Sequence, residues 1–221
     1  MRRLVLYSIM NPNANLQNMN KINNYLLKMI NKENPKVGYI ASETDRQRIY
    51  FNQTKKYYEL IGINDLEYID LDYEYDERQV KDLLKYDAIY LSTGNTFMFL
   101  SLLKKRNMLE PLRDYSNRGG ILIGASAGSI IMCNDISIAQ FADPNYVGIS
   151  DFNSLGLVDF EIKPHWDLWE DEIGAFKRYS MKKGRKIYGV RDGEAIIVEG
   201  DNISIYGEVT VIDNGAVYKE K

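Results

Sequence analysis

A serine between two glycines is the clearest chemical signal in this chain. The segment 124–128, Gly-Ala-Ser-Ala-Gly, has the spacing of a nucleophile elbow, in which a strand turns abruptly into a helix and presents the hydroxyl of Ser126. Glycine suits both flanks because a β-carbon there would collide with the turn. The chain contains one histidine, His165, so an imidazole that activates Ser126 has to be this one. The amide of Ala127, one residue after the serine, would be the first donor of an oxyanion hole.

A second glycine site follows another expected strand. Residues 90–96 read Tyr-Leu-Ser-Thr-Gly-Asn-Thr, an apolar run that ends in a polar turn and opens a helix. The backbone amide of Gly94 would therefore lie at the same sheet edge as Ser126, and two strand ends could supply two convergent donors. Asn95 or Thr96 also suits the N-cap of the helix that begins at Phe97, and we expect both to border the substrate.

The histidine needs a carboxylate on its far ring nitrogen, because otherwise the tautomer that accepts the serine proton is not fixed. Asp192, after an expected strand, is the first candidate, and Glu194 is the alternative. Asp167 is close to His165 in sequence. The chain order of α/β-hydrolase esterases, serine then acid then histidine, would select an aspartate between Ser126 and His165. Those aspartates are Asp135, Asp143, Asp151 and Asp159.

Short apolar runs alternate with amphipathic segments along most of the chain. The pattern predicts strands at 4–9, 36–41, 66–71, 88–91 and 121–124, and helices at 15–32, 42–60 with Ser42 as N-cap, 76–85 and after Thr96. Strands separated by helices imply right-handed βαβ units and a largely parallel sheet with helices on both faces. The run 121–123 is apolar throughout, as a central strand should be, and would deliver Ser126 to the carboxyl edge of the sheet.

The pattern changes after Gly193. Short β-rich runs at 195–198, 203–206 and 209–212 are split by glycine turns, which is typical of an antiparallel arrangement. With 221 residues, of which 45% are hydrophobic, the chain is long enough to bury the core of one α/β domain over residues 1–221.

Four motifs together resemble a known family. Residues 91–96, 124–128, 163–165 (Lys-Pro-His) and 188–193, in this order and at this spacing, resemble the aspartyl dipeptidase (peptidase E) family of serine peptidases over nearly the whole chain. The resemblance implies a three-layer α/β sandwich, similar to class I glutamine amidotransferases, with a small antiparallel C-terminal part. It also implies a Ser-His-Glu triad.

Carried over by position, the resemblance makes Ser126 the nucleophile, His165 the base, and Gly94 with Ala127 the oxyanion donors. The chain departs from the family at two places. Asp192 stands where the family usually has glutamate, with Glu194 two residues on, and Ser92-Thr93 stand where glycines are common.

The resemblance further implies a short peptide substrate with an N-terminal aspartate, which requires a nearby cation. Lys177, Arg178 and Arg191 are candidates by their place in the sequence. Trp166, Trp169 and Tyr146 could line the pocket, and the segment 134–159 could form a loop that borders the cleft.

Composition excludes several classes of protein. The net charge is −3 and no basic block is long enough to follow a phosphate backbone, which argues against nucleic acid as a partner. No apolar stretch approaches the roughly 20 residues that span a bilayer. The lone cysteine, Cys133, and an N-terminus without signal-peptide features lead us to expect a cytoplasmic protein. We expect no cofactor and no metal, because one histidine and one cysteine cannot build a usual zinc site. A monomer and a homodimer are equally compatible with the sequence.

Three other hypotheses stay open at this point. The chain could be an esterase with the acid placed before the histidine, or a binding module in which the glycine motif is only a tight turn. A glutamine amidotransferase would carry cysteine at the elbow, whereas Cys133 lies on the helix beyond it and is expected in the core.

Overall fold

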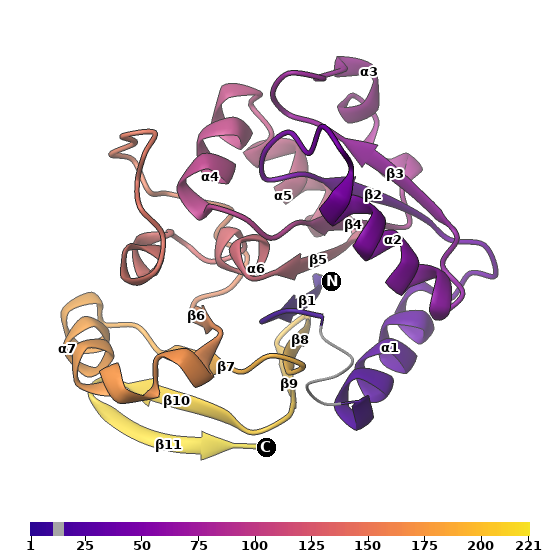
Figure 1. Cartoon of the computed structure of the whole chain (residues 1–221). Coiled ribbons are helices and arrows are strands. Elements are labelled where there is room, and N and C mark those ends of the chain that lie inside the picture. Colours follow the sequence, from indigo (N-terminus) through magenta and orange to yellow (C-terminus); the bar gives the residue numbers. More distant parts are fainter. Residues whose placement is uncertain (11–15) are drawn as a thin grey trace.

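A seven-stranded, mostly parallel sheet forms the centre of the protein (Figure 1). The computed structural model describes residues 1–10 and 16–221. In spatial order the strands are β3 (Asp65–Ile69), β2 (Lys36–Ile40), β4 (Ala88–Leu91), β5 (Ile121–Ala125), β1 (Arg3–Tyr7), β8 (Ala195–Glu199) and β9 (Asn202–Tyr206). The first five run parallel to one another, and β8 and β9 continue the sheet in antiparallel pairing beyond β1. The carboxyl ends of β2, β4, β5 and β1 therefore share one edge.

Helices cover both faces of this sheet, as the sequence pattern predicts. They are α1 (Leu16–Ile30), α2 (Ile49–Leu60), α3 (Glu77–Val80), α4 (Thr96–Lys105), α5 (Leu109–Asn117) and α6 (Ala127–Ile131), whereas α7 (Ile173–Lys183) packs on a second sheet. Alternate residues of β1 enter different cores, because neighbouring side chains on a strand point to opposite faces. Val5 is buried with residues of α1 and α2, whereas Leu4 is buried with residues of α4 and α5. The layers are thus helix, sheet and helix.

A second, four-stranded sheet lies beside the first and carries α7 (Figure 1, orange and yellow). Its order is β11 (Ala216–Glu220), β10 (Val209–Asp213), β7 (Ile187–Val190) and β6 (Glu161–Pro164), and only β6 and β7 are parallel. The prediction of antiparallel strands after Gly193 is confirmed. These strands do not form one unit, however, because β8 and β9 extend the central sheet while β10 and β11 pair with β7.

Three helix predictions need correction. The helix expected at 42–60 begins at Ile49, and Ser42 is not its N-cap: the Asp45 carboxylate accepts hydrogen bonds from the first backbone amides of α2 instead. The helix expected at 76–85 is the short α3 followed by a single 3-10 turn, Leu83–Lys85. Two helices, α4 and α5, lie where one was expected after Thr96. The predicted helix at 15–32 begins one residue outside the described part of the chain, and α1 ends at Ile30.

The strand predictions at 36–41, 88–91 and 121–124 are confirmed within a residue at each end, and those at 4–9 and 66–71 are displaced by up to two residues. β6 and β11 were not predicted. β6 reads Glu-Ile-Lys-Pro. Two charged residues and a proline leave it without the apolar pattern by which a buried strand is predicted. Within residues 1–10 and 16–221, no helix combines the length and apolar character that crossing a membrane requires.

Candidate active site

Ser126 occupies a strained turn between β5 and α6. Its backbone has φ 50° and ψ −109°, a conformation that residues other than glycine rarely adopt. A β-carbon on Gly124 would lie 2.6 Å from the carbonyl of Gly128, and one on Gly128 would lie 2.1 Å from the carbonyl oxygen of Leu91. Both glycines of the motif are therefore required by contact, as the sequence interpretation proposed.

His165 lies directly over this serine, although it comes from the second sheet. It follows β6 and has a left-handed backbone with φ 56°. The Nε2 atom of His165 is 3.1 Å from Ser126 Oγ, and its Nδ1 atom is 2.8 Å from Asp192 Oδ1. A carboxylate only accepts hydrogen bonds, so in the neutral imidazole Nδ1 carries the proton and Nε2 is free to accept one from the serine hydroxyl.

Asp192 lies in the turn after β7 and is the carboxylate that contacts the histidine. Burial alone would raise its pKa, but hydrogen bonds with His165 and Ser8, together with the charge of His165, hold the pKa of Asp192 below its usual value. The side chain thus stays ionised at neutral pH, as an orienting group for an imidazole should.

The other candidate acids are engaged elsewhere. Both oxygens of Glu194 accept backbone amides, of Arg191 at 3.0 Å and of Glu208 at 2.9 Å. Three of the aspartates that an esterase order would select have partners away from the imidazole: Asp135 pairs with Lys183 and Arg185, Asp143 with Thr96, and Asp151 with Lys104. Neither Asp159 nor Asp167 has a hydrogen bond to His165 within the described residues.

The amides of Gly94 and Ala127 are both free to donate. Within residues 1–10 and 16–221 neither forms a hydrogen bond. The Thr93 carbonyl accepts from Ser42 Oγ at 2.6 Å and from Ser92 Oγ at 3.1 Å. Because a trans peptide directs its C=O and N–H oppositely, the Gly94 amide points away from Ser42. The hydroxyls of Ser42 and Ser92 therefore hold this turn in place through the Thr93 carbonyl.

Gly94 itself cannot carry a side chain in this conformation. Its φ is +138°, and a β-carbon would approach Ser42 Oγ to 2.1 Å. Glycine at this position thus serves both the backbone turn and the close contact with Ser42.

A cavity of about 290 Å³ opens in front of the serine. Its walls come from four segments, and they include Thr93, Gly94, Thr96, Ser126, Ile130, Ala139, Ala142, Asp143, Lys163, Pro164 and His165. The predicted loop at 134–159 therefore does border the site, through Ala139, Ala142 and Asp143.

Of the three residues expected to bind substrate, only Thr96 lines this cavity, and its hydroxyl is hydrogen-bonded to Asp143. Asn95 caps α4 through Met98 N and donates to the Pro144 carbonyl. Trp166 is 1% exposed and packs over Gly189 and against Phe176, so it belongs to the core and not to the pocket wall. The place of Trp166 directly after the histidine does not reveal this, because neighbouring side chains can point to opposite sides of the chain.

Lys163 is a site residue to which sequence reasoning gave no role. Its side chain lines the cavity yet is 3% exposed, and its Nζ lies 4.1 Å from the ring centre of Trp169. Within the described residues no carboxylate oxygen comes within 4.0 Å of this ammonium group. Burial lowers the pKa of Lys163 to about 8, while the charge of Asp143 acts in the opposite direction. Its place in the Lys-Pro-His motif, two residues before the histidine, was the available signal in the sequence.

The cations that sequence proximity suggested lie elsewhere. Arg191 pairs with Glu170, and neither Lys177 nor Arg178 lines the cavity. Tyr146 is 83% exposed and Trp169 contacts the cavity only through Lys163.

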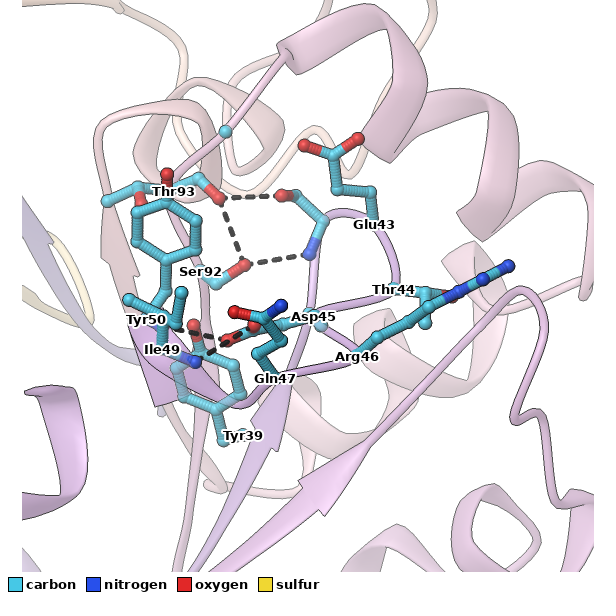
Figure 2. Close-up of a pocket in the computed structure, with 13 residues that line it drawn as sticks. Tyr39, Glu43, Thr44, Asp45, Arg46, Gln47, Ile49, Tyr50, Ser92 and Thr93 are labelled. Carbon is cyan, nitrogen blue, oxygen red and sulfur yellow. Dashed lines mark hydrogen bonds between the residues drawn. The ribbon is translucent and has the colours of Figure 1, made fainter. Parts of the chain in front are cut away.

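A larger cavity of about 560 Å³ has Thr93 and Gly94 in its lining in common with the first. Figure 2 shows the residues that line it. It lies between the 42–50 segment and the turn after β4. Tyr39 and Ala41 form part of its apolar wall, and Ile49 and Tyr50 at its rim are 48% and 62% exposed. Asp45 and Ser42 hold the segment through the hydrogen bonds described above. A ligand that passes Gly94 would therefore meet a wall of mixed apolar and polar side chains, and the polar ones include Glu43 and Arg46.

Comparison with known proteins agrees with this arrangement. Residues 9–206 match peptidase family S51. The chain is 29% identical over 166 residues to the uncharacterized peptidase Lmo0363 of Listeria monocytogenes, covering 74% of this chain and 80% of that one. It is 26% identical over 132 residues to a Drosophila melanogaster protein named as a probable alpha-aspartyl dipeptidase, which is 55% of this chain and 53% of the relative.

A crystal structure from Listeria monocytogenes EGD-e that carries a provisional peptidase E name has the same fold. Its TM-score is 0.75 at 24% identity, with 93% of this chain and 98% of that chain covered. The resemblance to peptidase E and the expected α/β fold are both confirmed. With the family match spanning most of its length, the chain belongs to peptidase family S51, the serine peptidases that include peptidase E.

Proposed function

We propose that this serine peptidase hydrolyses short peptides with an acidic N-terminal residue, with Ser126 as nucleophile, His165 as base and Asp192 as orienting acid. The observation that carries the proposal is the continuous contact from hydroxyl to imidazole to carboxylate, at 3.1 Å and 2.8 Å. Three residues from three separate loops meet in the order that acyl transfer requires.

The reaction would proceed in two halves. Ser126 Oγ attacks the peptide carbonyl while its proton passes to His165 Nε2, and the negative charge that forms on the carbonyl oxygen is held by the amides of Gly94 and Ala127. The C–N bond then breaks as His165 returns the proton to the departing amine. Water repeats the same steps on the acyl-enzyme and releases the acid.

The position of Lys163 is the observation that supports an acidic N-terminal residue in the substrate. Its ammonium group is buried in the cavity wall and has no carboxylate within 4.0 Å among residues 1–10 and 16–221, so a substrate carboxylate would meet a positive charge in a poorly hydrated place. Charge-assisted hydrogen bonds are strong in such surroundings. This lysine supplies the cation that an N-terminal aspartate needs, from a position that sequence proximity did not suggest.

The test begins with the nucleophile. A fluorophosphonate probe should label the wild-type protein and fail to label Ser126→Ala, while Ser116→Ala is labelled normally. Ser116 is a suitable control because it is fully buried in α5 and its hydroxyl has no hydrogen-bond partner within the described residues.

A dipeptide panel then tests the substrate. We expect the highest kcat/KM for Asp-Xaa members, and much lower values for Ala-Xaa and Lys-Xaa. Hydrolysis of the Asp-Xaa peptides by Ser126→Ala at more than about one-thousandth of the wild-type rate would contradict the assigned nucleophile. Equal rates for acidic and neutral members would contradict the substrate class alone.

A further inference from the structure

Ser8 stands at a junction between the histidine and its carboxylate. It is the first residue after β1 and is fully buried. Its Oγ donates a hydrogen bond to Asp192 Oδ1 at 2.7 Å and accepts one from the His165 backbone amide, also at 2.7 Å. Ser8 therefore contacts two of the three residues that the proposed mechanism uses.

The direction of both hydrogen bonds is fixed by chemistry. A carboxylate can only accept and a backbone N–H can only donate, so the single proton of the Ser8 hydroxyl has to point at Asp192 while a lone pair faces His165. A side chain without a hydroxyl would leave the part-buried backbone amide of His165 without this acceptor and would remove one donor from Asp192.

The neighbours of Ser8 hold the same loops. Ser8 N donates to the Glu194 carbonyl at 3.3 Å, and the Ile9 carbonyl accepts from Gly193 N at 3.2 Å. The Tyr7 carbonyl accepts from Ser126 N at 3.2 Å. The end of β1 thus connects the loops of all three residues, which come from two different sheets.

His165 has particular need of such an anchor. Its backbone is left-handed, with φ 56°, a conformation that is costly for a residue other than glycine and persists only where surrounding contacts impose it. The bond from its N–H to Ser8 Oγ is a contact of this kind. It fixes the point from which the imidazole extends toward Ser126.

We propose that Ser8 is a positioning residue of this peptidase, whose hydroxyl holds the His165 backbone and the Asp192 carboxylate in register. The inference rests on the proposed roles of Ser126, His165 and Asp192. It adds a fourth side chain that does not touch the substrate but sets how well the imidazole is oriented.

The sharpest experiment compares Ser8→Thr with Ser8→Val. Both variants add the same number of heavy atoms to a fully buried position, so they share any packing strain, and only threonine keeps the hydroxyl. We expect kcat of Ser8→Thr to exceed that of Ser8→Val by about 10-fold or more, because hydrogen bonds to charged groups are worth that much. The thermal midpoint of Ser8→Val should be somewhat lower, because the His165 amide loses its acceptor in that variant, so kcat is compared at a temperature at which both variants are folded. Equal kcat values with both variants folded and measurably active would overturn the proposal.

If the added atoms inactivate both Ser8→Thr and Ser8→Val, a comparison of Ser8→Ala with Ser116→Ala tests the proposal instead. We expect kcat of Ser8→Ala to fall about 10- to 100-fold with KM nearly constant, and the fluorophosphonate labelling rate to fall in parallel. Ser116→Ala should match the wild type. A loss of less than fivefold in Ser8→Ala overturns the role of Ser8.

Ser126→Ala, measured beside these variants, separates the two proposals. If it abolishes turnover while Ser8→Ala remains active, only the role of Ser8 fails. If Ser126→Ala remains active, the proposed mechanism itself fails.

Discussion

Asp192 Oδ1 lies 2.8 Å from His165 Nδ1, although the two residues come from the ends of two adjacent parallel strands, β7 and β6. The contact is short because the strands are in register: Pro164, just before the histidine, pairs with Val190. An aspartate at this place reaches the imidazole without the extra methylene of the glutamate that the family usually carries.

Substitution of Asp192 should therefore lower mainly kcat, whereas substitution of Glu194 should lower mainly the thermal midpoint. We expect Asp192→Asn to lower kcat by about 10³- to 10⁴-fold, because an amide no longer fixes the productive tautomer. Glu194→Gln should keep kcat within a few-fold. It should lower the thermal midpoint, since a glutamine has one acceptor oxygen for the two backbone amides that Glu194 binds. Steady-state kinetics and thermal unfolding of both variants check this.

Circular dichroism of Asp192→Asn provides the control, since its fold should be retained. A large kcat loss in Glu194→Gln, with Asp192→Asn nearly unaffected, would exchange the two roles.

Gly94→Ala should damage catalysis more than its strain alone explains. The new β-carbon would meet Ser42 Oγ at 2.1 Å, so the turn that carries the Gly94 amide has to move. Loss of one oxyanion donor typically costs about 10²- to 10³-fold in kcat, and we expect a fall of this size with KM nearly constant.

Gly62→Ala is the matched control for that variant. Gly62 also has a positive φ, +89°, but a β-carbon there meets nothing within 4 Å. We expect it to lose about 1 kcal/mol of stability and no activity. Equal kcat in the two variants would show that the position of the Gly94 amide is unimportant.

Local sequence patterns predicted most of what lies on the central sheet. The strand before Ser126 is apolar throughout, and the spacing of glycines marked the turns that follow β4 and β5. Ser126 and the amides of Gly94 and Ala127 could therefore be placed from short segments. Asp192 could be found because it follows a strand, although the choice between it and Glu194 needed coordinates. Contact with His165 depends on how β6 and β7 pair across 26 residues of chain, which no local pattern records.

Ser8 and Lys163 were missed for a related physical reason. Ser8 is a small polar residue after a strand, and its partner His165 is 157 positions away. Lys163 looks like a surface charge in sequence, because burial of a lysine is rare and leaves no local mark. Trp166 was misplaced because its place next to His165 in sequence does not fix which way its side chain points, and it packs against Phe176 and over Gly189.

The activity on acidic peptides should fall in alkaline solution. Burial lowers the pKa of Lys163 to about 8, so its ammonium is charged below that pH and neutral above it. A substrate carboxylate would lose its partner as the lysine deprotonates. We expect kcat/KM for Asp-Xaa to fall about tenfold per pH unit above about pH 8, relative to the value for Ala-Xaa at the same pH.

The ratio between the two substrates removes effects of pH on the rest of the site. A ratio that stays constant from pH 7 to pH 10 would exclude Lys163 as the group that binds the substrate carboxylate.

Lys163→Met should separate function from stability at a single position. Methionine has similar length and no charge, so we expect kcat/KM for Asp-Xaa to fall by about 10- to 100-fold while Ala-Xaa hydrolysis changes little. The same variant should be more stable than the wild type at pH 7 by roughly 1 to 3 kcal/mol. Below about pH 8 the folded protein holds a charged ammonium in a buried place, whereas the unfolded chain solvates it fully.

The sign of this stability difference also fixes its pH dependence. The pKa of Lys163 is lower in the folded protein than in the unfolded chain, so the penalty is complete below about pH 8. It shrinks as pH rises toward the ordinary lysine value of about 10.4. Denaturant unfolding of both proteins at pH 7 and pH 10 should therefore show a gain for Lys163→Met that is large at pH 7 and small at pH 10. A variant less stable than the wild type at pH 7 would mean that the contact of Lys163 with Trp169 outweighs the cost of burying the charge.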